Sequence, residues 1–550
     1  MKTKFFTIVL LAFIGLSSNT NAQSPNWLWA KSAGGSDDDN GRSISTDTNG
    51  NSYITGDFKS PTITFGSTIL TNANAGGYAT DIFIVKYDGA GNVLWAKSAG
   101  GTVDDDVESI STDANGNSYI TGYFGGHTIT FGNTTLTNAG LGGFFVVKYD
   151  GAGNVLWAKS AGGSNDAHGN SISTDTNGNS YITGMFFYST SFGSTTLTNV
   201  GGNDIFIVKY DGAGNVLWAK SAGGTGNDNG KSISSDANGN SYIIGNFISP
   251  TITFGSTTLT NVSSLYEGDI FIVKYDGAGN VLWAKSAEGS ANDNGWSIST
   301  DANGNSYITG YFQSPTITFG STTLINTGGT NIFVVKYDGA GNVLWAKSAG
   351  GTSGSITTDA NGNPYITGVF FSSITFGSTT LTGYGSDIFV VKYDGAGNVL
   401  WAKSAGGTGS DWGKSISTDA NGNSYITGCS NSPTITFGNT TLTNAGGWDI
   451  FVAKLDNVTG IVEDNEPFNA ITIFPNPANG NFTVNSKIKI SKIEVINVQG
   501  KKVYTSQINT TQSILEGLST EIDLSNESKG IYFVNIIADE KTYNSKIIIQ

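Results

Sequence analysis

The chain contains almost no cysteine, histidine or methionine and has few charged residues. Among 550 residues there are one cysteine, two histidines and two methionines, and charged residues make up 13%. A single cysteine excludes an intramolecular disulfide. Two histidines are too few for a His/Cys metal cluster. We find no amphipathic segment with a 3.6-residue period, and the 76 glycines favour an all-β chain of short strands joined by tight turns.

A basic surface and long apolar segments are also missing. The formal net charge of −15 argues against a nucleic-acid partner. The apolar run at residues 5–16 is shorter than the about 20 residues that cross a bilayer. Because it follows Lys2 and Lys4 and precedes small and polar residues, residues 1–22 are predicted to be a secretory signal peptide that is cleaved near Ala22. We expect an exported mature chain with no transmembrane segment.

One repeated sequence dominates the chain. Its tryptophan recurs with a spacing of roughly 56 to 66 residues, which is typical of stacked or radially arranged units. A second marker, Ser109 to Gly122 and its variants, keeps step with the first. Both count seven repeats, and the tryptophans of the first marker are Trp29, Trp95, Trp157, Trp218, Trp283, Trp345 and Trp401.

Each repeat is expected to form four antiparallel strands. The pair Asn115-Gly116 supplies the positive φ angles of a tight hairpin, and a four-stranded unit repeated seven times predicts a seven-bladed β-propeller at residues 23–455. The chain begins with a last-strand sequence at residues 27–32 and the array stops after a third strand at residues 449–455. We therefore expect the N-terminal strand to complete the last blade and close the ring, with an open β array as the alternative.

The repeats resemble the SBBP-type β-propeller repeat. The matching residues in the second repeat are Gly116 to Gly122, Phe145 to Lys148 and Trp157 to Gly163, and the resemblance covers about residues 27 to 455. This resemblance implies a propeller but says little about activity, because one fold hosts many functions.

The end of the chain is different. Residues 456–467 are predicted to be a linker, and residues 468–550 a small β-sandwich. This region resembles the type A sorting domain of type IX secretion cargo in Bacteroidota, which implies the type IX secretion machinery as a partner and a secreted or outer-membrane-surface location. An ordinary accessory module is the alternative. The residues that carry the sorting motif are Phe474, Pro475, Asn476, Pro477, Gly500, Gly530, Ile531 and Tyr532.

Catalytic and metal-binding motifs are not evident. The sequence has no nucleophile elbow, phosphate-binding loop or zinc motif, although two carboxylates from different blades could form a glycosidase-like pair. Asp-Ala-Asn-Gly-Asn runs such as the one at Asp113 are interpreted as hairpin turns rather than calcium loops. Cys429 stands where other repeats have Tyr123 or Asp57 and is interpreted as a bystander thiol. We assign no enzyme activity, cofactor or metal.

A binding face is predicted from differences among the repeats. The turns after the first and third strands are nearly constant, whereas the loop after the second strand and the link between blades vary. Three tryptophans outside the repeated register are expected in those variable segments: Trp296, Trp412 and Trp448. Aspartates at one aligned position of the links are expected to form a broken acidic ring near the channel mouth: Asp39, Asp105, Asp228, Asp293 and Asp411.

These residues lead to a functional hypothesis and its rivals. The tryptophans would stack on a ligand and the acids would bind hydroxyls or cations; alternatively, the aspartates cap turns and the tryptophans fill loops. The favoured function is a secreted or cell-surface, non-enzymatic binding or adhesion protein for a protein or glycan ligand. The rivals are a secreted hydrolase of extracellular polysaccharide and a structural component of a surface layer.

Overall fold

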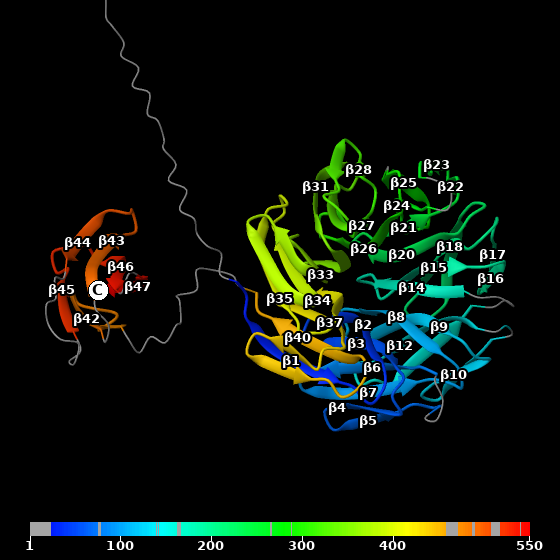
Figure 1. Ribbon diagram of the computed structural model, residues 1–550, viewed down its shortest axis with the longest axis horizontal. Coiled ribbons are helices and arrows are strands. Elements are labelled where there is room, and N and C mark those ends of the chain that lie inside the picture. The colour runs from blue at the N-terminus through cyan, green and yellow to red at the C-terminus, as the bar shows by residue number, and fades with distance from the viewer. Residues whose placement is uncertain are drawn as a thin grey trace, which may run out of the picture. The chain divides into compact units, whose positions relative to one another are not determined.

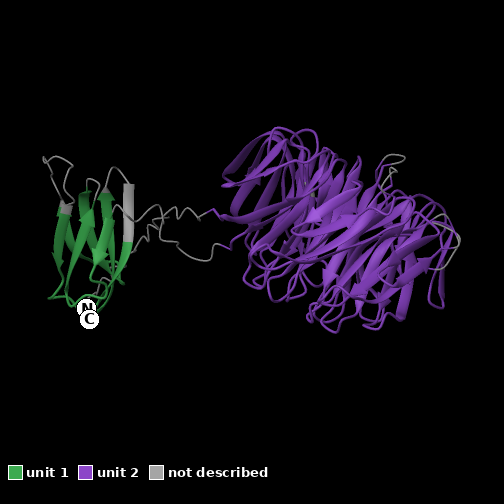
Figure 2. Ribbon diagram, turned by 90° about the horizontal axis from the view of Figure 1, so that it is seen from below, with its two compact units in different colours: residues 1–23, 458–550 green, residues 24–457 purple. Residues whose placement is uncertain are grey.

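The computed structural model describes residues 24–74, 79–138, 140, 142–161, 167–263, 267–287, 289–457, 471–486, 490–507, 518–538 and 541–550. Residues 24–457 form one compact unit, and the strands between Ile471 and Ile549 belong to a second unit (Figure 2). The predicted signal peptide and positions 458–467 of the predicted linker lie outside the described residues. Within the described ranges, no helix is long and apolar enough to cross a membrane.

The first unit is built from four-stranded antiparallel sheets, of which the described residues form seven (Figure 1). We number them sheets 1–7 in the order of their first strands.

The first strands are β2 (Asp39–Thr46), β8 (Asp105–Thr112), β14 (Ala167–Thr174), β20 (Asp228–Ser235), β26 (Asp293–Thr300), β32 (Thr352–Thr358) and β36 (Asp411–Thr418). The second strands are β3 (Ser52–Phe58), β9 (Ser118–Phe124), β15 (Ser180–Phe186), β21 (Ser241–Phe247), β27 (Ser306–Phe312), β33 (Pro364–Phe376) and β37 (Ser424–Ser430). The third strands are β6 (Asp81–Tyr87), β12 (Gly143–Tyr149), β18 (Asp204–Tyr210), β24 (Asp269–Tyr275), β30 (Asn331–Tyr337), β34 (Thr379–Tyr393) and β40 (Asp449–Leu455). The fourth strands are β7 (Val93–Ala99), β13 (Val155–Ser160), β19 (Val216–Ala222), β25 (Val281–Ala287), β31 (Val343–Gly350), β35 (Val399–Ala405) and, for sheet 7, β1 (Trp27–Ala33).

The fourth strand of sheet 7 comes from the other end of the array. Strand β1 pairs antiparallel with β40, with Trp27 opposite Leu455 and Ala33 opposite Ile450 (Figure 1). The backbone N–H of Asn26 also donates a hydrogen bond to the Asp456 carboxylate, 430 positions away. The two incomplete ends of the repeat array therefore complete one sheet.

Both faces of the third strands are covered by neighbouring sheets, which explains their unbroken apolar sequence. In sheet 3, Ile205, Phe206, Ile207 and Val208 are all buried. Alternate side chains along such a strand point to opposite faces, so each strand contributes to two apolar clusters. The repeated tryptophans lie at the same junctions. In sheet 1, the Trp95 indole N–H donates to the Gly151 carbonyl of sheet 2 over 3.1 Å.

Hydroxyl groups join the first strands of adjacent sheets. Between sheets 1 and 2, the Ser45 and Thr112 hydroxyls lie 2.9 Å apart, and Thr112 also donates to the Thr46 carbonyl. The same contacts link sheet 7 to sheet 1, where the Thr46 hydroxyl lies 2.9 Å from that of Ser417 and donates to the Thr418 carbonyl over 2.8 Å.

A short additional hairpin follows the second strand of six sheets in the described residues. In sheet 6 the corresponding residues instead extend β33 and β34. The hairpins are β4 (Thr62–Phe65) with β5 (Thr68–Thr71), β10 (Thr128–Phe131) with β11 (Thr134–Thr137), β16 (Ser189–Phe192) with β17 (Thr195–Thr198), β22 (Thr251–Phe254) with β23 (Thr257–Thr260), β28 (Thr316–Phe319) with β29 (Thr322–Ile325), and β38 (Thr434–Phe437) with β39 (Thr440–Thr443).

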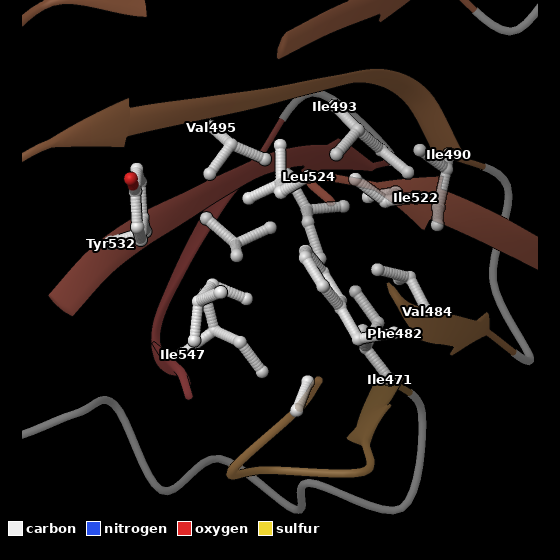
Figure 3. Packing of buried hydrophobic residues seen from close by; sticks show 14 residues of the cluster. Ile471, Phe482, Val484, Ile490, Ile493, Val495, Ile522, Leu524, Tyr532 and Ile547 are labelled. Carbon is white, nitrogen blue, oxygen red and sulfur yellow. The ribbon is translucent and has the colours of Figure 1, made fainter. Parts of the chain in front are cut away.

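The second unit is a β-sandwich of one three-stranded and one four-stranded sheet. Phe482 and Ile522 from one sheet meet Ile493, Val534 and Ile547 from the other in its core (Figure 3). The edge strand β45 (Leu518–Asp523) pairs antiparallel with the central strand β42 (Asn481–Ser486). The strands are β41 (Ile471–Phe474), β42 (Asn481–Ser486) and β45 (Leu518–Asp523) in the first sheet, and β44 (Lys502–Gln507), β43 (Ile490–Asn497), β46 (Gly530–Ala538) and β47 (Lys541–Ile549) in the second.

Candidate functional site: variable residues around the central cavity

A cavity of about 670 Å³ is lined by the first strands of all seven sheets. Each of these strands contains a β-bulge, at which one residue falls outside the ladder between two paired neighbours. In β2 the bulge residue is Arg42, between Gly41 and Ser43. A bulge re-aims a side chain relative to the regular alternation of a strand. The seven bulge residues all line the cavity: Arg42, Glu108, Asn170, Lys231, Trp296, Gly354 and Lys414.

The bulge residues differ from sheet to sheet although the strands around them are nearly constant. The Ser-Ile that follows is the same in all seven first strands. Two further positions vary in the same way, namely the first-strand residue two positions before the bulge residue and its pairing partner on the second strand. These pairs are Asn40 with Asp57, Asp106 with Tyr123, His168 with Met185, Asn229 with Asn246, Asn294 with Tyr311 and Trp412 with Cys429, and sheet 6 has Val369 at the second-strand position. We call the bulge residues and these partners the variable ring.

The rarest residue types of the chain gather in the variable ring. Arg42 is the only arginine and Cys429 the only cysteine, and one of the two histidines and one of the two methionines are His168 and Met185. The exposed tryptophans of the described residues, Trp296 and Trp412, belong to it as well, and each is 44% exposed. Of these residues, Arg42, Trp296 and Trp412 line the cavity itself.

Sheets 1 and 2 contribute a group of paired charges. The Arg42 guanidinium forms an ion pair with Asp57 and lies 3.7 Å from Asp106 and 3.8 Å from Glu108. Burial raises the pKa of Glu108 and of Asp106, and the nearby Arg42 charge opposes that increase. On this side of the cavity, the single arginine is offset by three carboxylates.

Sheets 4, 5 and 7 combine lysines with tryptophans. The Lys231 ammonium lies 5.6 Å from the centre of the Trp296 ring, and burial lowers the pKa of Lys231. The Lys414 ammonium lies 6.0 Å from the Trp412 ring and donates a hydrogen bond to Asn40 over 3.2 Å. Both arrangements are cation–π contacts.

Two of the three predicted tryptophans line the cavity. Trp296 and Trp412 do so from strands β26 and β36, so their predicted placement in links or loops was wrong. Trp448 lies just before β40 and packs on Trp412, with ring centres 5.1 Å apart. The bulge residues Arg42, Lys231 and Lys414 were missed, although the only arginine of the chain, directly before the constant Ser-Ile pair, was a visible signal.

The predicted acidic ring is wrong. All five aspartates, Asp39, Asp105, Asp228, Asp293 and Asp411, are fully buried. The Asp39 carboxylate accepts hydrogen bonds from the backbone N–H groups of Gly35, Lys59 and Ser60 and from the Ser60 hydroxyl. These aspartates therefore fasten the link before the first strand to the loop after the second strand, in agreement with the alternative of turn capping.

The Asp-Ala-Asn-Gly-Asn runs are turns. Asp113 Oδ1 accepts hydrogen bonds from the backbone N–H groups of Asn115 and Asn117, and Oδ2 accepts from the Asn117 amide and the Tyr119 hydroxyl. Gly116 has a φ of 77°, which favours glycine. No group of three or more His, Cys, Asp or Glu residues suited to a metal ion occurs in the described part of the chain.

The predicted sorting-motif residues lie at the edges and turns of the β-sandwich. Asn476 fixes its loop to β47 by donating to the Lys546 carbonyl and accepting from the Ile548 N–H. Gly500 has a φ of 79° in the turn between β43 and β44, and Gly530 begins β46. Along β46, Ile531 is exposed and Tyr532 is buried, while Phe474 is exposed at the end of β41. Pro475 and Pro477 follow directly.

Comparison with protein families identifies both parts of the chain. Residues 28–57, 156–185 and 400–433 match the family described as a beta-propeller repeat. Residues 472–550 match the secretion system C-terminal sorting domain. The chain carries β-propeller repeats and a C-terminal sorting domain. A sorting domain of this kind identifies an exported protein that is secreted or held at the cell surface.

Curated relatives and solved structures share low sequence identity with this chain. An uncharacterized WD repeat-containing protein of Acanthamoeba polyphaga mimivirus is 28% identical over 538 residues, which cover 78% of this chain and 38% of that protein. The regulatory protein FlaEY of Caulobacter vibrioides is 26% identical over 174 residues, covering 30% and 18%. The chain thus spans less than two fifths of the length of these relatives. Sqt1 from Chaetomium thermophilum aligns with a TM-score of 0.35 and 8% identity, covering 79% of this chain and all of that one.

Proposed function

We propose that the protein is an exported, non-enzymatic binding protein, and that the variable ring of a closed seven-bladed propeller contacts its ligand. The observation that carries the proposal is the concentration of non-repeated and rare residues around one cavity, on strands that are otherwise nearly identical. A scaffold that needed only to fold could carry the same bulge residue in every sheet. A ring of different residues instead presents an asymmetric surface, which specific recognition requires.

Contacts between the first and last sheets support the closed ring. Strand β1 completes sheet 7, and the hydroxyl contacts of Thr46 join sheet 7 to sheet 1 as those of Thr112 join sheet 1 to sheet 2. With β1 in place, β40 is paired on both sides and is not a sheet edge.

The chemistry of the cavity favours binding over catalysis. Glu108 is the one carboxylate among the described residues that line the cavity, and it lies 3.8 Å from Arg42. A secreted hydrolase that uses this group is the rival function, and a structural surface-layer component is the other. Hydrolysis would require two carboxylates that face each other across a bound sugar.

In this proposal, the segments at the two ends of the chain direct its export. The signal peptide is removed near Ala22 after it directs the chain to the periplasm. The sorting domain then engages the type IX secretion machinery, which moves the protein to the outer-membrane surface or the medium. This route is supported by the sorting-domain match at residues 472–550.

The binding function is tested by screening the purified protein on arrays of glycans and surface proteins, with hydrolysis products measured in the same wells. A variant with Trp296→Ala, Trp412→Ala and Trp448→Ala is expected to lose the bound signals and keep its unfolding temperature. A matched control replaces three leucines that are each 52% exposed on fourth strands, Leu94→Ala, Leu217→Ala and Leu282→Ala. Equal binding by both variants would contradict the proposed site, and released sugars would favour the hydrolase.

A further inference from the structure

We infer that the cavity wall at sheet 6 recognises an acidic sugar residue of an oligosaccharide, held between Trp296 and Trp412. This inference rests on the proposed binding function, and it names the ligand class and the part of the variable ring that selects it.

Sheet 6 contributes no bulge side chain to the variable ring, and we call this interruption of the ring the gap. In the other sheets six residues separate the repeated Gly-Gly or Glu-Gly pair from the bulge, whereas only residues 352 and 353 separate Gly351 from Gly354. The bulge residue itself has no side chain, and a Cβ atom at Gly354 would come within 2.3 Å of the Gly413 carbonyl oxygen. At the second-strand position, sheet 6 has Val369 where sheets 2 and 5 have the larger Tyr123 and Tyr311.

Aromatic residues border this gap on both sides. Sheet 5 contributes Trp296 and Tyr311 to the cavity wall, and sheet 7 contributes Trp412. These sheets are the direct neighbours of sheet 6, because Ile356 of sheet 6 donates to Ser297 of sheet 5 and Thr418 of sheet 7 donates to the Thr358 carbonyl. The apolar C–H face of a sugar ring can stack on an exposed aromatic ring.

Cations lie beside both tryptophans. Lys231 lies over Trp296, and Lys414 lies over Trp412. Lys231 has no carboxylate within ion-pair distance among the described residues. The acidic residues of the ring lie instead around Arg42 in sheets 1 and 2. Glu108 lines the same cavity and acts electrostatically on Lys231 and Lys414, so a ligand carboxylate at sheets 4 to 7 would meet two ammonium donors and one acid of the variable ring.

The remaining wall is rich in hydroxyl and amide groups, which suits a sugar better than an acidic peptide. Ser297, Ser355, Thr352 and Asn170 line the same cavity. A volume of about 670 Å³ lies within the range of pockets that enclose small ligands, about 300–1,000 Å³. The cavity can hold a few sugar rings, either at the end of an oligosaccharide or at a bend in it.

The test uses the full chain and measures tryptophan fluorescence and titration calorimetry. The probes are hexamers of galacturonic acid and of mannuronic acid, neutral maltohexaose, and hexaglutamate. We expect an acidic hexamer to quench the fluorescence and to bind at least about tenfold more tightly than maltohexaose, a difference equivalent to about 1.4 kcal/mol. Binding of the acidic hexamer should weaken as salt concentration rises.

Three variants locate the site. Trp412→Ala removes an aromatic wall, Lys414→Met removes a charge, and Val369→Tyr fills the gap with the residue that sheets 2 and 5 already carry. Each should weaken binding of the acidic hexamer at least about tenfold without changing the unfolding temperature. The control Lys97→Met removes a lysine from fourth strand β7 and should leave binding unchanged.

The outcomes separate this inference from the proposed function. If maltohexaose binds as tightly as the acidic hexamers and Val369→Tyr abolishes its binding, the cavity is a binding site but acidic-sugar recognition is wrong. Preferred binding of hexaglutamate would replace the sugar with an acidic peptide. If no acidic hexamer binds, the inference fails, while the array screen still decides the proposed function.

Discussion

Gly126 deprives the buried Asp105 carboxylate of a hydroxyl donor. In four other sheets a serine stands 21 residues after the corresponding aspartate, as Ser249 follows Asp228, and its hydroxyl donates to that carboxylate over 2.7 Å. Gly126 occupies the serine position in sheet 2, and Asp105 Oδ2 has no donor among the described residues. Burial raises the pKa of Asp105 to about 7, with nearby Asp81 adding to the increase.

Restoring the serine should stabilise sheet 2. Gly126→Ser supplies the missing donor, and a Cβ atom there would meet Val103 Cγ2 at 3.1 Å, a flexible side chain on the surface. We expect the free energy of unfolding at pH 8 to rise by about 1 kcal/mol, measured by chemical denaturation. The reverse change, Ser249→Gly in sheet 4, should lower it by a similar or larger amount. A loss of stability in Gly126→Ser would contradict this account of Asp105.

Stability should fall as pH rises from about 4 to about 7. Burial raises the pKa of Asp39, Asp81, Asp204 and Asp387 to about 6, and that of Asp105 to about 7. The folded state therefore holds more protons in this window than the unfolded state, and raising the pH removes protons at a cost to the fold. Unfolding temperatures measured between pH 4 and pH 8 should show this decline.

A substitution tests the assignment to one group. Asp81→Asn introduces the residue that sheet 5 carries at this position as Asn331, and it removes one titrating carboxylate. The decline in stability with pH should become shallower in this variant, whereas Asp88→Asn, in an exposed turn where hydrogen bonds with Asn92 lower the pKa of Asp88, should not flatten it. Parallel pH profiles for the wild type and Asp81→Asn would argue against this origin of the pH dependence.

Closure of the ring can be tested at a single hydroxyl. Thr46→Val removes the contacts between sheets 7 and 1, and Thr112→Val removes the equivalent contacts between sheets 1 and 2. In a closed ring both should lower the free energy of unfolding by a similar amount, about 1–2 kcal/mol. In an open array only Thr112→Val would matter, so equilibrium denaturation of the two variants distinguishes the arrangements.

Deleting residues 26–35 is a stronger version of the same test. The deletion removes β1 and exposes β40, a strand that is buried throughout. We expect aggregation or a marked loss of thermal stability. An unfolding temperature equal to that of the intact chain would show that β1 is dispensable.

The sorting domain is tested by truncation. Removing residues 468–550 should leave the protein in the periplasm of the host, detected by cell fractionation. The first unit should remain folded, because its described strands pair only with one another. A double variant, Ile531→Ser and Phe533→Ser, changes two exposed residues and leaves the core of the sandwich intact. It tests whether the secretion machinery recognises the surface of the sandwich. Normal release of the truncated protein into the medium would refute the sorting role.

Local sequence was sufficient to predict the repeated strands but not the contacts of the aspartates. Strand positions can be predicted from short segments, because turn geometry and burial depend on a few neighbouring residues. Examples are the turn at Asn115-Gly116 and the apolar run from Ile205 to Val208. Asp39 was misplaced because its partner Ser60 lies 21 positions away in a loop. The β-bulge at Arg42 changes the regular alternation of side chains along β2. The direction of the Arg42 side chain into the cavity therefore depends on how β2 pairs with β3.

The pairing of β1 with β40 sets the order in which the protein can finish folding. A chain that enters the periplasm from its N-terminus delivers β1 first and its partner, Asp449–Leu455, only after the other six sheets have emerged. During that interval β1 is a strand without a partner and a potential site of intermolecular association. A chain that ends before Asp449 therefore lacks the strand that pairs with β1 and leaves sheet 7 incomplete.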